Sequence, residues 1–273
     1  MALGLQVTYG LSGQLSVAVA PVAGMGAYAT AHLMTFERWP FWAALPAAVV
    51  AAALTGTIVG LPSLRVRGDV LALVTLGAGE ILDTVYLNTR GFFGAYDGIS
   101  GVPPVTIGGV TLSDAQLYAV GIGLTVVGLL AVGALADSPV GRAWRADRDD
   151  VTAATALGVP GPPMRLLAFT LGSAVAGLGG ALYVAHTGFV SSTAFALPRT
   201  VDVILVVLLA GDGRMLRTVA ASAGLSVVID KLAGYASVSE AVTGALVLLV
   251  VAQRLGAASW LRSSLRRRVR VRA

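Results

Sequence analysis

The amino-acid sequence predicts an all-α, polytopic integral membrane protein with about eight transmembrane or re-entrant helices. Of its 273 residues, 56% are hydrophobic and only 12% are charged, whereas a soluble domain carries about a quarter charged residues. Four runs without Asp, Glu, Lys or Arg are 22 to 36 residues long and cover residues 1–36, 39–64, 115–136 and 166–198. Since a helix needs about 20 apolar residues to cross the hydrocarbon core of a bilayer, each run is long enough for a span.

The hydropathy pattern divides the chain into eight expected elements. They cover roughly residues 1–35, 41–62, 69–87, 114–136, 165–186, 200–211, 218–236 and 240–254. The first is too long for one straight span, and Pro21, Gly24 and Gly26 predict a crossing helix plus a broken or re-entrant half-helix. Charged residues interrupt the sixth and seventh elements at positions 202 and 230–231, so we expect tilted helices or half-helices there.

The distribution of basic residues predicts that both termini lie in the cytoplasm. With the N-terminus inside, 15 basic residues fall in inner segments and 4 in outer segments, and without the C-terminal tail the ratio is still 8 to 4. Basic residues stay on the cytoplasmic side, so the ratio decides the orientation. Residues 1–254 then form one transmembrane domain. We expect residues 255–273 to be a basic cytoplasmic tail that contacts anionic lipid headgroups, not nucleic acid.

A charged segment at about residues 138–163 lies on the cytoplasmic side in this topology. Pro139 suits the first turn of a helix, and Gly158, which prolines soon follow, suits its end. The expected helix is amphipathic by its 100° step per residue. Its apolar side carries Val140, Trp144, Val151 and Ala154, and its polar side carries Arg142, Arg145 and Asp149.

Two interpretations of this helix remain open from the residues alone. It either lies against the ends of the protein's own transmembrane helices or docks as a coupling helix in a groove of a separate motor subunit. In the second case Trp144 is the expected anchor, since aromatic side chains fill such grooves.

The residues exclude several kinds of chemistry. No Gly-rich loop with Lys and Ser or Thr is present, so we expect no ATP hydrolysis by this chain and no enzymatic activity. There is no Cys and only two His, so we expect neither a disulfide nor a metal cluster, and no cofactor of its own.

Acidic residues within the apolar elements are the candidates for a translocation path. Glu80 and Asp83 lie three residues apart on one face of the third element, and Asp202 lies in the sixth. The alternative for these residues is a role in contacts between helices. The longest outer loop, at about residues 88–113, contains Tyr96, Asp97 and Gly98 among glycines and prolines that predict turns.

Four stretches resemble the LivH/LivM permease family of branched-chain amino-acid ABC transporters, in particular its LivM-like branch. They are residues 10–16 with 24–28, residues 64–77 with 79–82, residues 97–103, and the positions between 138 and 183 that begin with Ser-Pro-Val-Gly-Arg and end with Gly-Gly-Ala-Leu-Tyr. Together they follow the family's order along nearly the whole chain. Three positions depart from it: the family's early His is Val19 or Ala20 here, its acidic residue before Ala-Leu-Gly is Thr155, and its late glycine motif is altered at residues 211–221.

The resemblance implies a permease subunit of an importer in the bacterial cytoplasmic membrane, translocating branched-chain or related amino acids. Its implied partners are a second permease subunit, identical or different, two ATPase subunits that bind the ATP, and an extracytoplasmic solute-binding protein that the outer loop would face. The implied ATPase-coupling residues are Gly141, Arg142, Trp144, Arg145, Arg148, Asp149, Asp150 and Gly158. The alternatives are an ABC permease for another small solute (urea or an amide, a sugar or a nucleoside) and a stand-alone secondary carrier.

Overall fold

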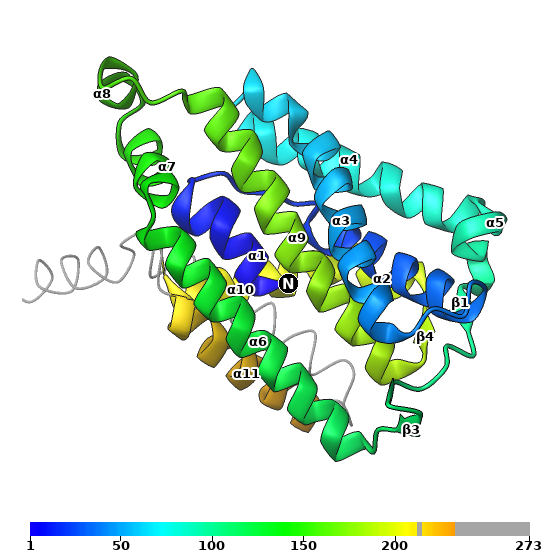
Figure 1. Ribbon diagram of the computed structural model, residues 1–273. Coiled ribbons are helices and arrows are strands. Elements are labelled where there is room, and N and C mark those ends of the chain that lie inside the picture. Colours follow the sequence, from blue (N-terminus) through cyan, green and yellow to red (C-terminus); the bar gives the residue numbers. More distant parts are fainter. Residues whose placement is uncertain (212–214, 233–273) are drawn as a thin grey trace, which may run out of the picture. The chain divides into compact units, whose positions relative to one another are not determined.

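The computed structural model describes residues 1–211 and 215–232, with side chains as far as residue 226. The chain divides into two compact units, residues 1–220 and 221–273, and the first contains the elements discussed below (Figure 1). Helix α11 (Met215–Leu232) begins in the first unit. The expected element at 240–254 and the basic tail at 255–273 lie outside the described residues.

Five helical segments within the described residues are long and apolar enough to cross a membrane. This confirms the all-α, multi-span fold class. The segments are Phe41–Leu64, Asp69–Asn88, Asp114–Asp137, Gly161–Thr187 and Ser192–Ala210. They contain α3 (Phe41–Gly60) with the 3₁₀ turn η2 (Leu61–Leu64), α4 (Asp69–Asn88), α6 (Asp114–Asp137), α9 (Gly161–Thr187), and the 3₁₀ turn η4 (Ser192–Phe195) with α10 (Leu197–Ala210).

The first element is broken, as the sequence predicts, but at a different place. It consists of α1 (Ala2–Leu5), the π-helical turn η1 (Gln6–Leu11), a non-helical stretch at residues 12–18, and α2 (Val19–Thr35). Pro21 therefore does not mark the break. It lies in the first turn of α2, where its missing N–H costs no helical hydrogen bond. Side chains replace the missing helical partners near the break: Thr75 Oγ1 accepts from the Val17 N–H at 3.0 Å, and Thr200 Oγ1 accepts from the Ala20 N–H at 3.3 Å.

Helix α9 is the centre of the unit, with α1, α2 and α3 packed around it (Figure 1). The small residues of the run 172–181 let these helices approach closely. Gly26 of α2 lies against the backbone of Gly177, and Gly180 lies against the backbone of Ala23. Close packing of small residues replaces the hydrophobic effect, which does not drive helices together inside a bilayer.

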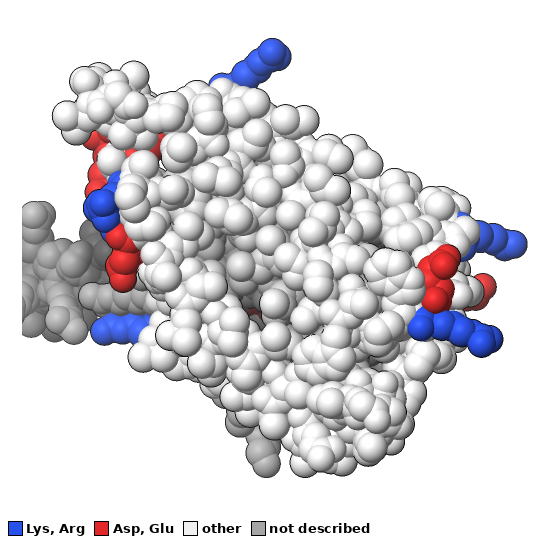
Figure 2. Space-filling view, viewed as in Figure 1, with Lys and Arg blue, Asp and Glu red and all other residues white. Residues whose placement is uncertain are grey.

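The two ends of the unit are distinct. At one, which we call the α7 end, α3 and α6 finish and α4 and α9 begin, with α7 (Pro139–Asp149) and α8 (Val151–Ala156) between them. At the other, the α5 end, lie α5 (Arg90–Phe93), the 3₁₀ turn η3 (Ala95–Asp97) and four two-residue strands. On the face drawn in Figure 2, charged side chains lie along two opposite sides with a broad band almost free of charge between them.

The strands at the α5 end are a feature that the sequence interpretation did not include. Strand β1 (Ile99–Ser100) pairs antiparallel with β4 (Phe189–Val190), and β2 (Thr106–Ile107) pairs antiparallel with β3 (Val110–Thr111). The first pair fastens the loop after α4 to the end of α9. Beneath it, the rings of Tyr28, Tyr86 and Phe93 pack with centroids 4.8 to 5.2 Å apart.

Candidate functional site

Helix α7 begins directly after α6 because the residues at the junction stop one helix and start the next. Ser138 caps the new helix: its hydroxyl oxygen accepts from the Gly141 N–H at 3.3 Å and donates to the Leu135 carbonyl at 2.6 Å. Pro139 occupies the first turn, where a residue with a fixed φ and no N–H fits best. Only Ser138 thus separates the end of α6 from the start of α7.

Trp144 is fully buried inside the chain's own core. Its indole packs in one cluster with Val132 and Ala136 of α6 and Ala168 of α9, and its Nε1 donates to the Met164 carbonyl at 2.6 Å. The expectation that Trp144 anchors the helix in a partner's groove is therefore wrong for this structure. The apolar side of α7 instead packs on the transmembrane helices, where burial of the large aromatic ring is favourable.

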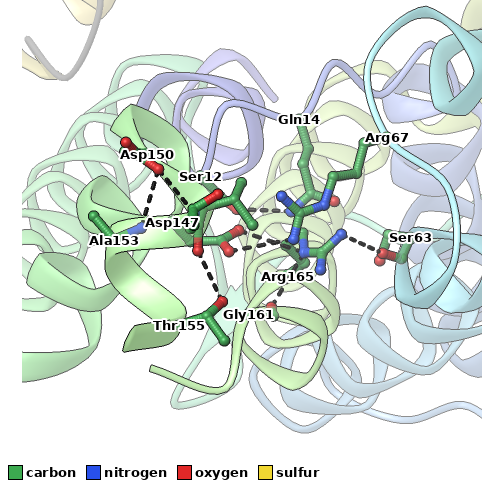
Figure 3. Close-up of polar contacts among 12 residues, drawn as sticks. Ser12, Gln14, Ser63, Arg67, Asp147, Asp150, Ala153, Thr155, Gly161 and Arg165 are labelled. Carbon is green, nitrogen blue, oxygen red and sulfur yellow. Dashed lines mark hydrogen bonds and ion pairs between the residues drawn. The ribbon is translucent and has the colours of Figure 1, made fainter. Parts of the chain in front are cut away.

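An ionic network centred on the buried Asp147 connects α7 to α9 (Figure 3). Asp147 Oδ2 lies 3.4 Å from Arg165 Nε of α9, and Asp147 Oδ1 lies 3.4 Å from Arg67 Nη2 of the loop between η2 and α4. Arg165 also donates to two carbonyl oxygens, that of Gly161 at 3.2 Å and that of Ser63 at 3.1 Å. The buried charges of Asp147 and Arg165 are tolerated because they pair with each other and because Arg165 makes these further hydrogen bonds.

The network leaves no room for a side chain at the start of α9. A Cβ added to Gly161 would lie 2.3 Å from Asp147 Oδ1, well inside van der Waals contact. The absence of a side chain at this position therefore allows α7 and the first turn of α9 to meet. Sequence interpretation singled out neither Asp147 nor its partners Arg165 and Arg67. A signal existed, since position 147 continues the spacing of Val140, Trp144, Val151 and Ala154 and so places a charge on the apolar side.

Asp150 divides the expected single helix into α7 and α8. Its backbone is extended, with φ −152° and ψ 108°, and its Oδ1 accepts from the N–H groups of Thr152 and Ala153 at 2.8 and 3.0 Å. An Asp in this position caps a new helix more favourably than it continues an old one. Gly158 follows α8 with φ +83°, which agrees with its expected helix-ending role.

The candidate coupling residues fall into an exposed and a supporting group. Arg142, Asp149, Asp150 and Gly158 are exposed, and Arg145 is half-buried. Arg148 is half-buried and donates to the Gly10 carbonyl, so it ties α7 to the end of η1. Leu157, which the sequence interpretation did not select, is 82% exposed at the end of α8.

The three candidate path residues are not brought into one cluster. Glu80 is exposed on α4, and Asp83 is half-buried with its Oδ1 buried and without a hydrogen-bond partner. Asp202 lies 3.9 Å from Arg199, three residues earlier on α10. Neither these residues nor the other described ones form a group of three or more His, Cys, Asp or Glu that could hold a metal ion.

Tyr96 and Asp97 form part of the surface at the α5 end. Tyr96 is 76% exposed, and Asp97 is also exposed. Gly98 follows them with φ +66°, and a Cβ there would lie 2.2 Å from the Val190 carbonyl oxygen. Only glycine fits this contact, so Gly98 holds η3 against the strand pair β1–β4 and fixes the place of the two exposed side chains.

Comparison with known proteins agrees with this architecture. The model of the family described as "Branched-chain amino acid transport system / permease component" matches residues 1–251. Two relatives, from Salmonella typhimurium and Escherichia coli, are each described as the high-affinity branched-chain amino acid transport system permease protein LivM. Each is 34% identical to the chain over 278 residues, which cover 93% of the chain and 65% of the relative. The chain thus spans 65% of the length of these relatives. No solved structure matches it.

Proposed function

The chain belongs to the family of permease components of branched-chain amino acid transport systems, a multi-pass protein of the bacterial inner membrane, and on that premise we propose that it is one transmembrane subunit of an ATP-binding-cassette importer. Its substrate is a branched-chain or related amino acid. A second permease subunit, two ATPase subunits and an extracytoplasmic binding protein complete the importer. The ATP is bound by the ATPase subunits, and this chain uses no cofactor.

The observation that carries this proposal beyond family membership is the connection between α7 and the transmembrane helices. Asp147 joins α7 to Arg165 of α9 and to Arg67 of the loop after η2, and Trp144 joins it to the first turn of α9. A subunit without an ATPase loop must receive force from a partner. The close-packed contacts of Asp147 and Trp144 transmit a displacement of α7 to the transmembrane helices. When ATP draws the two ATPase subunits together, movement of α7 and α8 changes the position of α9 and with it the access to the path.

The exposed groups on α7 and α8 are the proposed contact surface for the ATPase subunits. Arg142, Asp149 and Asp150 supply charges, while Leu157 supplies an apolar side chain that is 82% exposed and fits a groove. A helix that docks in a groove of a partner inserts the apolar side chains that it exposes. Leu157 thus takes the anchoring role that the sequence assigned to Trp144. Trp144 and Arg148 fix the position of this surface through their hydrogen bonds to α9 and to η1.

The orientation follows from the same assignment. The α7 end lies in the cytoplasm, where the ATPase subunits are, and the α5 end with Tyr96, Asp97 and Gly98 faces the binding protein. Both termini are then proposed to lie inside, in a chain of about eight transmembrane or re-entrant elements. Glu80, Asp83 and Asp202 are the proposed polar groups along the path or between helices.

Transport by the reconstituted complex tests this function. The chain is co-expressed with the ATPase, second permease and binding-protein subunits encoded beside it, purified, and placed in liposomes. Uptake of radiolabelled leucine, isoleucine or valine that requires both ATP and the binding protein is the expected result. If the complex instead takes up urea, an amide, a sugar or a nucleoside, the proposed substrate is wrong and the proposed importer function stands. Gradient-driven flux through liposomes that contain this chain alone would show a secondary carrier and overturn the proposal.

A further inference from the structure

We propose that the exposed face of α4, centred on Glu80, packs against the second transmembrane subunit, which presents a cation or hydrogen-bond donors to this carboxylate at the middle of the membrane. The inference rests on the proposed function, because it assigns a surface to one of the partners named there. It goes further in stating which helix meets that partner and which residue specifies the contact.

Glu80 lies deep within its span. It comes 11 residues after Asp69, the first residue of α4, and 8 residues before Asn88, the last. At a rise of about 1.5 Å per residue, it is roughly 12 Å from the nearer end. A glutamate side chain is too short to reach the headgroups over that distance, and an acidic group in hydrocarbon is costly. The carboxylate therefore requires a polar neighbour at this depth.

The side chains that the structure describes do not supply that neighbour. Glu80 is exposed, and within residues 1–211 and 215–226 its carboxylate makes no hydrogen bond or ion pair. The backbone carbonyl oxygen of Glu80 accepts a hydrogen bond from the Thr84 hydroxyl at 2.8 Å. Lys231, whose side chain lies outside the described residues, is the alternative cation within this chain, and adducts between α4 and the chain's own residues would identify it.

The exposed faces of two other spans show what a lipid-facing surface looks like in this protein. On α3 the exposed stripe is Val50, Leu54 and Ile58, and on α6 it is Ile122, Val126 and Leu130. Both are apolar, as contact with lipid tails requires. On α4, Leu73 and Ile81 are as exposed as these residues, but the exposed residues of this helix also include the charged Glu80. The α4 face thus combines apolar packing area with one charge that needs a partner.

Geometry restricts the identity of that partner. The ATPase subunits and the binding protein lie outside the bilayer, so neither reaches a residue about 12 Å from the end of α4. Another transmembrane chain does reach it. Ionisable residues within membrane spans commonly pair across such contacts or line a water-filled path, and a contact between two permease subunits provides either environment.

Site-specific photocrosslinking tests the assignment in the complete transporter. A benzophenone amino acid replaces Leu73 or Ile81 on α4, which are 69% and 65% exposed, and in matched controls Leu54 on α3 or Leu130 on α6, which are 62% and 67% exposed. Irradiated membranes are solubilised, and the adducts are identified by mass spectrometry. We expect the α4 positions to form adducts with a second transmembrane subunit, and the α3 and α6 positions to form adducts with lipid only.

Three results would overturn the inference: lipid adducts alone at α4, adducts between α4 and the chain's own remaining residues, or equal adducts with a second subunit from the control positions. The proposed function is judged by a separate observation, the presence of ATPase subunits in the same purified complex. If they are present and α4 yields lipid adducts alone, the inference fails and the function stands.

Variants at Glu80 give a second readout. Glu80→Leu should lower recovery of the second transmembrane subunit at least ~10-fold, because truncating one member of a buried polar pair weakens association by that order or more. Glu80→Gln keeps hydrogen bonding and should retain more of the partner. Because the Glu80 carboxylate makes no hydrogen bond or ion pair with the described residues, thermal unfolding of the isolated chain should change little in both variants. Equal recovery of the second subunit with Leu and with Glu at position 80 would contradict the inference.

Discussion

Asp147 and Arg165 face each other across 3.4 Å, from carboxylate Oδ2 to guanidinium Nε, and both side chains are almost fully buried. Asp147 belongs to α7 and Arg165 to α9, so the pair joins the proposed coupling segment to the central transmembrane helix. A buried ion pair is stable only with good geometry and further hydrogen bonds. Here Arg67, Gly161 and Ser63 supply them.

Asp147→Ala should destabilise the protein strongly. It leaves Arg165 buried without its carboxylate, a change that typically costs about 3–5 kcal/mol. The free energy of unfolding in detergent measures the loss, and Asp149→Ala, at an exposed position on the same helix, is the control that should change little. In the double variant Asp147→Leu/Arg165→Met, the loss should be smaller than the sum of the two single losses, since neither charge is left unpaired. Additive losses would contradict the pairing.

Trp144→Ala should also act on stability. Removing a fully buried indole leaves a cavity and costs about 3–5 kcal/mol. Trp144→Phe keeps most of the packing but loses the bond to the Met164 carbonyl, for about 1 kcal/mol. Trp39→Ala, at an exposed tryptophan, is the matched control. A Trp144→Ala protein with unchanged stability but no ATPase binding would restore Trp144 as a partner anchor.

Gly161→Ala should disturb the same network from the α9 side. Its new Cβ would lie 2.3 Å from Asp147 Oδ1, so the carboxylate must move, at a cost of about 1–3 kcal/mol. Gly123→Ala on α6, where a Cβ meets nothing within 4 Å, should instead be neutral or stabilise by up to about 1 kcal/mol. Thermal unfolding of both variants decides whether the close contact exists.

Leu157→Asp and Arg142→Asp should uncouple ATP hydrolysis from uptake while the fold is retained. Both side chains are exposed, so their replacement should not change thermal unfolding. We expect each transported substrate molecule to require more ATP in liposomes that contain the complete transporter. Arg38→Asp at the opposite end is the control. Normal coupling in both α7–α8 variants would remove this surface from the proposed ATPase contact.

Tyr96→Ala should weaken the response to the binding protein and leave basal ATP hydrolysis and stability unchanged. Its ring is 76% exposed at the α5 end, and aromatic residues are frequent centres of binding energy. The concentration of binding protein that gives half-maximal uptake should rise in Tyr96→Ala and in Asp97→Asn. Thr111→Ala on the neighbouring hairpin is the control, and an equal rise there would show that the effect is not specific.

Local features of the sequence predict the spans well because their signals are local. Uncharged runs, the capping residues around Pro139 and the small residues at 172–181 each indicate the structure that is observed. The break in the first element was predicted but placed at Pro21 instead of residues 12–18. Proline is compatible with a first helical turn, and the position of the break depends on Thr75 and Thr200, which lie far away in the sequence.

The candidate site required more than local information. A helical wheel places Trp144 on an apolar side, but it does not say whether that side packs on the chain itself or on a partner. Asp147 had a visible signal as a charge on that side, whereas its partners lie 80 residues before it and 18 after it, at Arg67 and Arg165. Glu80 is visible in the sequence as a charge within an apolar element. Only the fold shows that no described residue forms a hydrogen bond or ion pair with its carboxylate.

The sequence by itself determined that this chain resides in a membrane, where most of its five described membrane-spanning segments begin and end to within a few residues, and which family it resembles. These properties depend on hydrophobicity and on capping, which act over one or two turns. The tertiary structure alone decided which polar groups are paired and which stay exposed. Pairing depends on distances of a few ångströms between residues remote in sequence, and folding alone brings these together.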